Sequence, residues 1–180
     1  HRYLGCYHNI HTGMFGSGIE YEVRDFMKQC CDKYCALGGD KPFTLISATT
    51  PFLDESTLPD SDNAESGELG DEACSILMKI LYGARMARYD LLRATCALAG
   101  KVTKWTKACD KKLHKLVSYI NSTLDHVLQG HVNDPPEDLY LKLFADADFA
   151  GCEKTSRSTS GVFLCLCGPN TFMPLAAMSK

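Results

Sequence analysis

The alternation of apolar and polar positions predicts that the chain opens with a β-hairpin. Residues 2–10 have the pattern of one strand, and residues 19–23 can return beside them as a second. Between the two stretches lie Gly13, Gly16 and Gly18, which supply the backbone freedom that a turn needs. We therefore expect two antiparallel strands before the first helix.

Apolar residues then recur at helical spacing in three stretches. The first runs from residue 23 to 37 and ends at Gly38-Gly39. The second starts near residue 72 and is weakened at Gly83, and the third covers residues 106–121. Apolar stripes of this kind are far more typical of a packed core than of a cofactor site.

A period of two returns near the end of the chain. Residues 139–145 alternate as a strand does, a second apolar run covers residues 162–166, and a third covers residues 171–177. Pro174 favours an edge position for the third of these strands, because proline cannot donate to a central ladder. The whole pattern predicts an α+β fold: a hairpin and a helical region followed by an antiparallel sheet.

Composition adds little to this picture. With 180 residues, 45% of them hydrophobic and 23% charged, the chain can bury a core, and its net charge of −3 argues against strong nonspecific binding of nucleic acid by the whole chain. No apolar run approaches the ~20 residues of a membrane span, and no signal peptide is visible.

The ten cysteines form no paired C-x-x-C framework, so we interpret them as reduced and mostly buried. A zinc site built from Cys30, Cys35, His8 and His11 is the lesser alternative.

Charge is distributed unevenly along the chain. Residues 54–72 contain eight acidic residues and no lysine or arginine, which predicts a solvated linker. Six lysines crowd the third helix and its approach, with Trp105 beside them: Lys101, Lys104, Lys107, Lys111, Lys112 and Lys115. Such a cluster is a plausible footprint for a phosphate backbone, and a lysine-rich solvated helix face is the equally weighted alternative.

Two carboxylates, Asp146 and Asp148, follow the strand predicted over residues 139–145. Carboxylate oxygens are suited to Mg²⁺, and a strand fixes the direction in which they point. A short acidic turn that binds no metal has the same pattern. From spacing alone the acidic turn is the better interpretation.

The stretch LKLFADADFAGCEKTSRSTSGVFLCLCG closely resembles the segment that opens the ribonuclease H domain in the polyproteins of copia-type retrotransposons. The match covers both aspartates, Phe149, Gly151 and residues 157–161 in order. The resemblance implies that Asp146 is the first metal-binding carboxylate of a ribonuclease H site, with Asp148 the weaker candidate and Arg157 a nucleic-acid contact.

Earlier stretches resemble the same family in the right order. Tyr3-Leu4-Gly5-Cys6 is similar to a strand that holds the primer end, which makes Leu4 and Gly5 primer-grip-like residues. ILMKILYGARMARYDLLRATCALAG and KLVSYINSTLDHVLQG resemble the helical region that follows, although Tyr89 stands where proline is usual. We expect Asp90 to cap a helix there and Arg88 to contact solvent or a loop.

The resemblance implies four regions. Residues 1–53 would form a primer-grip-like hairpin and a thumb-like helix, residues 54–72 an acidic linker, residues 73–134 a helical connection, and residues 135–180 the first three strands of a ribonuclease H-like sheet. The expected partners are an RNA–DNA hybrid or DNA and the remainder of the polyprotein, inside the cell and without a membrane.

Ribonuclease H chemistry uses two Mg²⁺ ions that several carboxylates neutralise together. Asp146, even with Asp148, supplies too few of them, and by resemblance the polymerase aspartates lie upstream. We therefore expect this fragment to be inactive alone, whereas the parent polyprotein synthesises DNA on RNA and cleaves the RNA of hybrids. Two alternatives are a noncatalytic piece that binds nucleic acid through the lysines and a purely structural piece.

Overall fold

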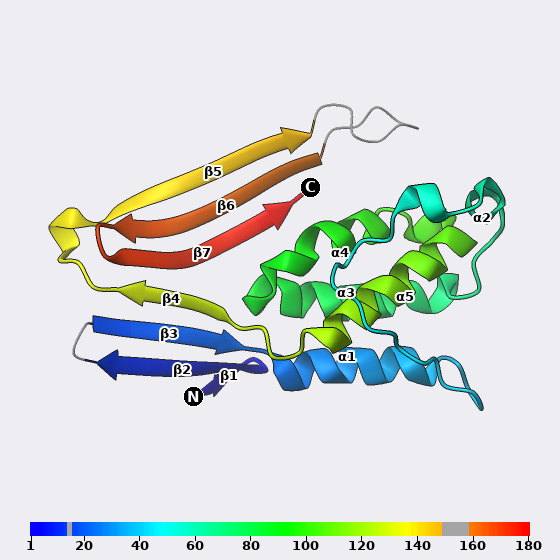
Figure 1. The fold of residues 1–180 in the computed structure, drawn as a ribbon, viewed down its shortest axis with the longest axis horizontal. Helices are drawn as coiled ribbons and strands as arrows, with labels where there is room; N and C mark the ends of the chain where they lie inside the picture. The colour runs from blue at the N-terminus through cyan, green and yellow to red at the C-terminus, as the bar shows by residue number, and fades with distance from the viewer. Residues whose placement is uncertain (14–15, 149–158) are drawn as a thin grey trace.

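The computed structural model describes residues 1–13, 16–148 and 159–180 (Figure 1). It confirms the predicted α+β class: an antiparallel sheet forms one half of the molecule and helices form the other. The strands are β1 (Arg2–Tyr3), β2 (Cys6–Gly13), β3 (Gly16–Glu22), β4 (Leu128–Val132), β5 (Tyr140–Asp148), β6 (Thr159–Gly168) and β7 (Thr171–Ser179). Over the described residues they form one seven-stranded sheet in the order β1-β2-β3-β4-β7-β6-β5.

The predicted hairpin is confirmed as β2 and β3, but the strand expected over residues 2–10 is interrupted. Leu4 and Gly5 have φ angles of 48° and 84°, and Tyr3 pairs with Cys6 across them. Two successive positive φ angles are typical of the tight turns that match the twist of a hairpin. Leu4 and Gly5 therefore lie at the tip of a β1–β2 turn rather than within a strand.

Strand β4 was not predicted. It lies between β3, from the N-terminal part of the chain, and β7, from the C-terminal part. It pairs with β3 over five residue pairs and with β7 at His131 and Phe172. The edge position expected for the Pro174 strand is therefore wrong, because β7 lies between β4 and β6. Pro174 is tolerated there because it pairs with Cys165 beside a β-bulge and lies beyond the recorded β4–β7 pair.

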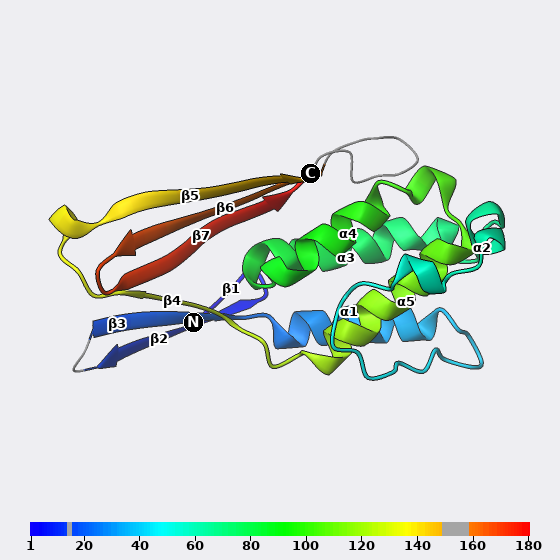
Figure 2. The same ribbon diagram turned by 45° about the horizontal axis from the view of Figure 1, so that its top comes forward.

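The α-helices are α1 (Arg24–Ala36), α2 (Asp60–Ala64), α3 (Gly70–Ala87), α4 (Leu92–Ala99) and α5 (Lys107–Ser122). Helices α1, α3, α4 and α5 pack around a common core (Figure 2). The predicted stripe of α5 is fully buried, since Leu113, Leu116, Val117 and Ile120 are each 0% exposed. Helix α3 continues through Gly83, where a Cβ atom would collide with Met27 of α1. Glycine is placed there because the two helices approach closely.

The acidic segment is not the solvated linker that its composition predicted. It contains a 3₁₀ turn (Glu55–Thr57) and α2, and α3 begins within it. Asp62 is only 3% exposed. The backbone of the segment also contacts α5, since the Lys107 amide donates to the Glu65 carbonyl at 3.0 Å. The segment is fixed because basic residues far along the chain provide partners for its carboxylates.

Arg88 and Asp90 also differ from their predicted roles. Arg88 is 2% exposed and donates to the Asp90 carboxylate, and its Nη1 donates to the Thr123 carbonyl at 2.9 Å. Asp90 accepts a further hydrogen bond from Tyr119 and forms no side-chain cap on α4. Because a buried charge requires a partner, this pair links the end of α3 to the end of α5.

No helix among the described residues has the length and apolar character required to span a bilayer. Within the same part of the chain every cysteine is a free thiol, and six of them are buried: Cys6, Cys30, Cys31, Cys109, Cys165 and Cys167. Burial raises the pKa of Cys30 to about 11 and that of Cys31 to about 12, which keeps both thiols protonated.

Candidate metal and nucleic-acid sites

Asp146 lies on β5, which forms one edge of the sheet. It pairs with Gly161 of β6, and its side chain is exposed. The C-terminal end of β5 points toward the helical half of the molecule (Figure 1). Asp148 is the last residue of the strand and pairs with Thr159 through its backbone. Arg157 lies outside the described residues.

The described residues do not form a complete metal site. Among them, no three His, Cys, Asp or Glu side chains lie close enough together to hold an ion, whether at Asp146 or at the cysteines and histidines of the zinc alternative. The oxygen of an exposed aspartate suits Mg²⁺, but two Mg²⁺ ions require several carboxylates. Asp146 can therefore contribute one ligand to a shared site and does not fit a two-ion centre alone.

The lysines of α5 and of the short turn before it fall into two groups. Lys107 and Lys111 are ion-paired with the acidic segment: Lys107 Nζ lies 3.1 Å from Glu65, and Lys111 Nζ lies 2.5 Å from the buried Asp62. Lys104 is exposed at the end of a short 3₁₀ turn, whereas Lys112 and Lys115 are half-buried on α5. A phosphate backbone at Lys107 or Lys111 would thus compete with carboxylates that are already in place.

Trp105 does not stand beside the lysines as an open stacking surface. It is 7% exposed, and its indole Nε1 donates to Asp110 at 2.6 Å. The same carboxylate accepts hydrogen bonds from the backbone amides of Glu68 at 2.7 Å and Leu69 at 3.2 Å, just before α3. Asp110 therefore holds the end of the acidic segment against α5.

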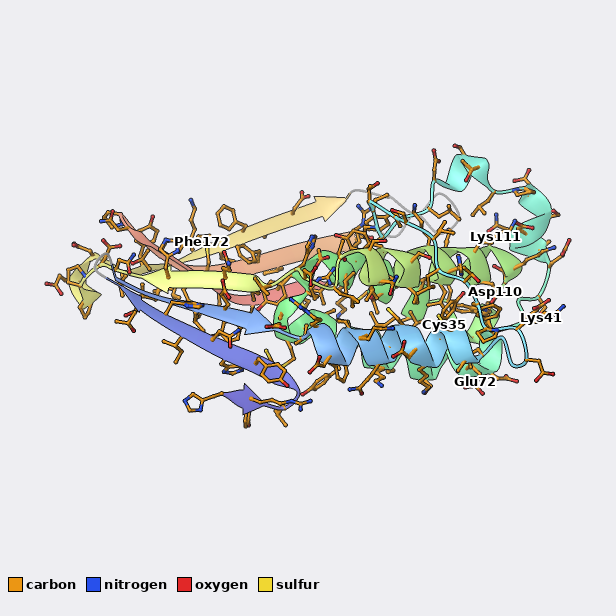
Figure 3. The ribbon with its side chains drawn as sticks, turned by 60° about the horizontal axis from the view of Figure 1, so that its bottom comes forward. Cys35, Lys41, Glu72, Asp110, Lys111 and Phe172 are labelled. Atoms are coloured by element: carbon orange, nitrogen blue, oxygen red, sulfur yellow. The ribbon has the colours of Figure 1, made fainter. Side chains whose placement is uncertain are left out.

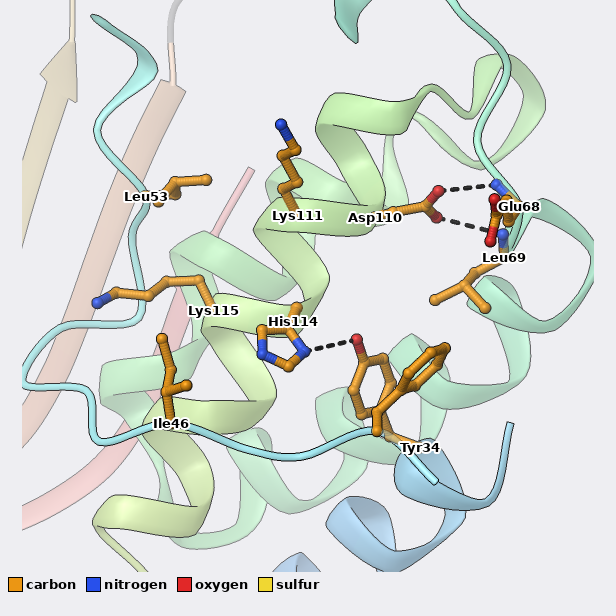
Figure 4. Close-up of a pocket in the computed structure, with 10 residues that line it drawn as sticks. Tyr34, Ile46, Leu53, Glu68, Leu69, Asp110, Lys111, His114 and Lys115 are labelled. Atoms are coloured by element: carbon orange, nitrogen blue, oxygen red, sulfur yellow. Dashed lines mark hydrogen bonds between the residues drawn. The ribbon is translucent and has the colours of Figure 1, made fainter. Parts of the chain in front are cut away.

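A pocket of about 410 Å³ lies between α1, α5 and the segment that follows α1 (Figure 4). Its walls are largely apolar: Tyr34, Phe43, Ile46, Leu53 and Leu69. The Tyr34 hydroxyl is hydrogen-bonded to His114 Nδ1 at 3.0 Å. Burial lowers the pKa of His114 and raises that of Tyr34, to which the charge of Asp110 also contributes.

This pocket was not predicted. Tyr34 and His114 are 80 residues apart in the chain. Each lies in a stretch with the usual alternation of apolar and polar residues of an amphipathic helix, so the sequence does not indicate that they meet. With both groups neutral, the pair can donate and accept hydrogen bonds inside an apolar pocket. Two lysines and two carboxylates complete its lining: Lys111, Lys115, Glu68 and Asp110.

Leu4 and Gly5, which were expected to be primer-grip-like, lie near the end of α3 that is farther from the pocket. The Leu4 carbonyl accepts a hydrogen bond from Tyr82 of α3 at 2.7 Å, while its side chain is 61% exposed. The turn is therefore attached to the helices through its backbone and presents its leucine to solvent. The labelled side chains of Phe172 on the sheet and Lys111 on α5 lie far apart along the molecule (Figure 3).

Comparison with protein-family models, curated proteins and solved structures finds no match to this chain. The structure establishes the α+β class and the positions of the candidate residues other than Arg157.

Proposed function

We propose that this chain is a region of a copia-type retrotransposon polyprotein, covering the end of a reverse transcriptase and the opening of its ribonuclease H domain. The observation that carries the proposal is the position of Asp146, the matched first metal-binding carboxylate. It is exposed near the end of β5, in an antiparallel β5–β6–β7 meander of the kind that the resemblance implies.

In this proposal Asp146 supplies one oxygen ligand for Mg²⁺, and the remainder of the polyprotein supplies the other carboxylates. Helix α5 and the 3₁₀ turn before it contribute to binding of the RNA–DNA hybrid through Lys104, Lys112 and Lys115, while Lys107 and Lys111 hold the acidic segment. The described residues lack a three-ligand cluster, so the chain alone binds hybrid without cleaving it.

The test is Mg²⁺-dependent cleavage of an RNA–DNA hybrid by this chain and by a version extended with its native downstream sequence. We expect cleavage by the extended version only, and we expect Asp146→Asn to abolish it. Asp138→Asn is the matched control, because it removes the same charge from an exposed position just before β5.

Cleavage by the short chain would contradict the count of carboxylates, and cleavage that survives Asp146→Asn would contradict the assigned role. If neither version cleaves, binding of the hybrid in the presence of a chelator distinguishes the two alternatives. Salt-sensitive binding supports the noncatalytic nucleic-acid-binding piece, and no binding supports the structural piece.

A further inference from the structure

The pocket between α1 and α5 is bounded on one side by the segment that follows α1, and hydrogen bonds fix this segment in place (Figure 4). The Phe43 amide donates to the Cys35 carbonyl of α1 at 3.0 Å, and the Ala48 amide donates to Ser122 Oγ of α5 at 3.1 Å. The pocket is therefore a preformed space between elements that are attached to one another, which is typical of small-molecule sites.

The volume and the walls of the pocket suit an aromatic ligand. A cavity of ~150 Å³ holds a benzene ring, so a pocket of about 410 Å³ has room for two fused rings. Tyr34 and Phe43 form an aromatic wall with their ring centroids 5.2 Å apart. The aliphatic part of the lining consists of Ile46, Leu53 and Leu69. Because Ile46 is 55% exposed, the pocket is open to solvent on that side and a ligand can enter.

The charged residues of the lining favour a neutral ligand. They are two lysines and two carboxylates, so their formal charges cancel: Lys111, Lys115, Glu68 and Asp110. A charged ligand of either sign would meet a like charge as well as an opposite one. Apolar walls would also have to replace part of its hydration shell, which is costly for an ion and not for a neutral aromatic ring.

Two of these charged groups already have partners. Lys111 is ion-paired with the buried Asp62. The Asp110 carboxylate accepts three hydrogen bonds, from the Trp105 indole and from the backbone amides of Glu68 and Leu69. Neither group therefore needs a ligand to satisfy it.

The Tyr34–His114 pair, in contrast, has hydrogen-bonding capacity left over. The Tyr34 hydroxyl bonds to His114 Nδ1, and within the described part of the chain His114 Nε2 has no hydrogen-bond partner. In Figure 4 the ring edge that carries Nε2 points away from Tyr34. If Tyr34 donates to Nδ1, then Nε2 carries the proton and donates, and in the other tautomer Nε2 accepts. A ligand hydroxyl can donate and accept, so it satisfies Nε2 in either tautomer.

We propose that this pocket binds a neutral aromatic ligand of two fused rings, with a hydroxyl group that is hydrogen-bonded to His114 Nε2. The rings occupy the apolar space beside Tyr34 and Phe43, and the hydroxyl pairs the polar atom that the chain itself leaves unpaired. The proposal is independent of the nucleic-acid function, since it uses neither Asp146 nor the lysines assigned to the hybrid.

The first test titrates the isotope-labelled native chain with three probes and follows its amide signals by NMR. The probes are 2-naphthol, naphthalene, which lacks the hydroxyl, and 2-naphthoate, which is an anion. We expect saturable shifts at Ile46 and Leu69, with 2-naphthol bound about fivefold more tightly than naphthalene because of one additional hydrogen bond. We expect 2-naphthoate to bind more weakly than 2-naphthol.

Three results of this titration would overturn the proposal. The first is the absence of saturable shifts at the pocket up to the solubility limit of 2-naphthol. The second is equal affinity for 2-naphthol and naphthalene, which would show that the hydroxyl forms no hydrogen bond. The third is tighter binding of 2-naphthoate, which would show that the pocket selects an anion.

The second test is His114→Phe, which removes the hydrogen bond and keeps an aromatic ring in the wall. We expect its affinity for 2-naphthol to fall about fivefold, to the level of naphthalene, while its affinity for naphthalene is unchanged. The exposed His126→Phe is the matched control and is expected to bind both probes as the native chain does. Equal losses for both probes in His114→Phe would mean that His114 only shapes the wall, and would contradict the proposal.

The single variant leaves the Tyr34 hydroxyl without its partner, which can itself destabilise the chain. The double variant Tyr34→Phe/His114→Phe removes both polar groups, so it avoids this cost. It is expected to remain folded, by its circular dichroism spectrum, and to bind 2-naphthol and naphthalene equally. A folded double variant that still prefers 2-naphthol would overturn the role of His114 Nε2.

Discussion

The helical half and the β5 end of the sheet contain similar apolar residues and bury them very differently. Leu113 and Leu116 of α5 are completely buried between helices, whereas Leu141 and Leu143 of β5 are more than 60% exposed. All four lie in regular elements with the expected periodicity. The difference shows that periodicity predicts which face of an element is apolar, while burial depends on whether another element covers that face.

The largest difference in the free energy of unfolding is expected when a leucine is truncated in each of the two regions. Leu116→Ala is expected to lower the free energy of unfolding by about 3 kcal/mol, because it leaves a cavity in a fully buried core. The matched variant Leu143→Ala is expected to change it by no more than about 0.5 kcal/mol. Denaturant titration at low protein concentration measures both values. Equal losses in the two variants would mean that β5 is covered in solution.

A second, smaller effect separates buried from exposed charge within the helical half. Lys111→Ala leaves the buried Asp62 carboxylate without its cation and is expected to destabilise the chain by about 1.5 kcal/mol. Lys107→Ala breaks a pair in which both side chains are about half exposed, and is expected to cost about 0.5 kcal/mol or less. If the two values agree, the acidic segment is not held against α5 through Asp62.

The smallest effect concerns the pH dependence of His114. Burial lowers its pKa in the folded state, so the unfolded chain binds more protons as the pH falls through the ordinary range of histidine. Its contribution to stability is therefore present near neutral pH and lost on acidification. We expect His114→Gln to show a smaller loss of stability between about pH 7 and about pH 5 than the native chain. The exposed His126→Gln is the control, and an equal change in both variants would contradict the prediction.

The sequence predicted the elements that depend on local pattern. The ends of α1 and α5 lie within two residues of the predicted stretches, and the hairpin and the three final strands are present. Strand β4 was missed because LQGHV is short and contains Gly130. A side chain at Gly130 would have to displace the Met173 side chain where β4 passes β7, and Pro174 also lies close.

The remaining errors involve contacts between distant parts of the chain. Residues 54–72 have the composition of a linker, but Asp62 meets a lysine 49 positions away. Arg88 was expected to contact solvent or a loop. It is buried, and it donates to Thr123, which lies 35 positions away in the turn after α5. For the candidate metal site, the sequence identifies Asp146 because the residues around it form a local pattern. The other ligands that the metal ion would need have no such local pattern and were not identified.

The contact between β4 and β7 has a mechanical consequence. Strands β6 and β7 are joined over eight residue pairs and β3 and β4 over five, but β4 and β7 are joined at one pair, assisted by the Thr171 hydroxyl. Among the described neighbouring strands, β4 and β7 therefore share the fewest paired residues. Because few backbone hydrogen bonds join them, we expect the sheet to open first between β4 and β7 under mechanical load.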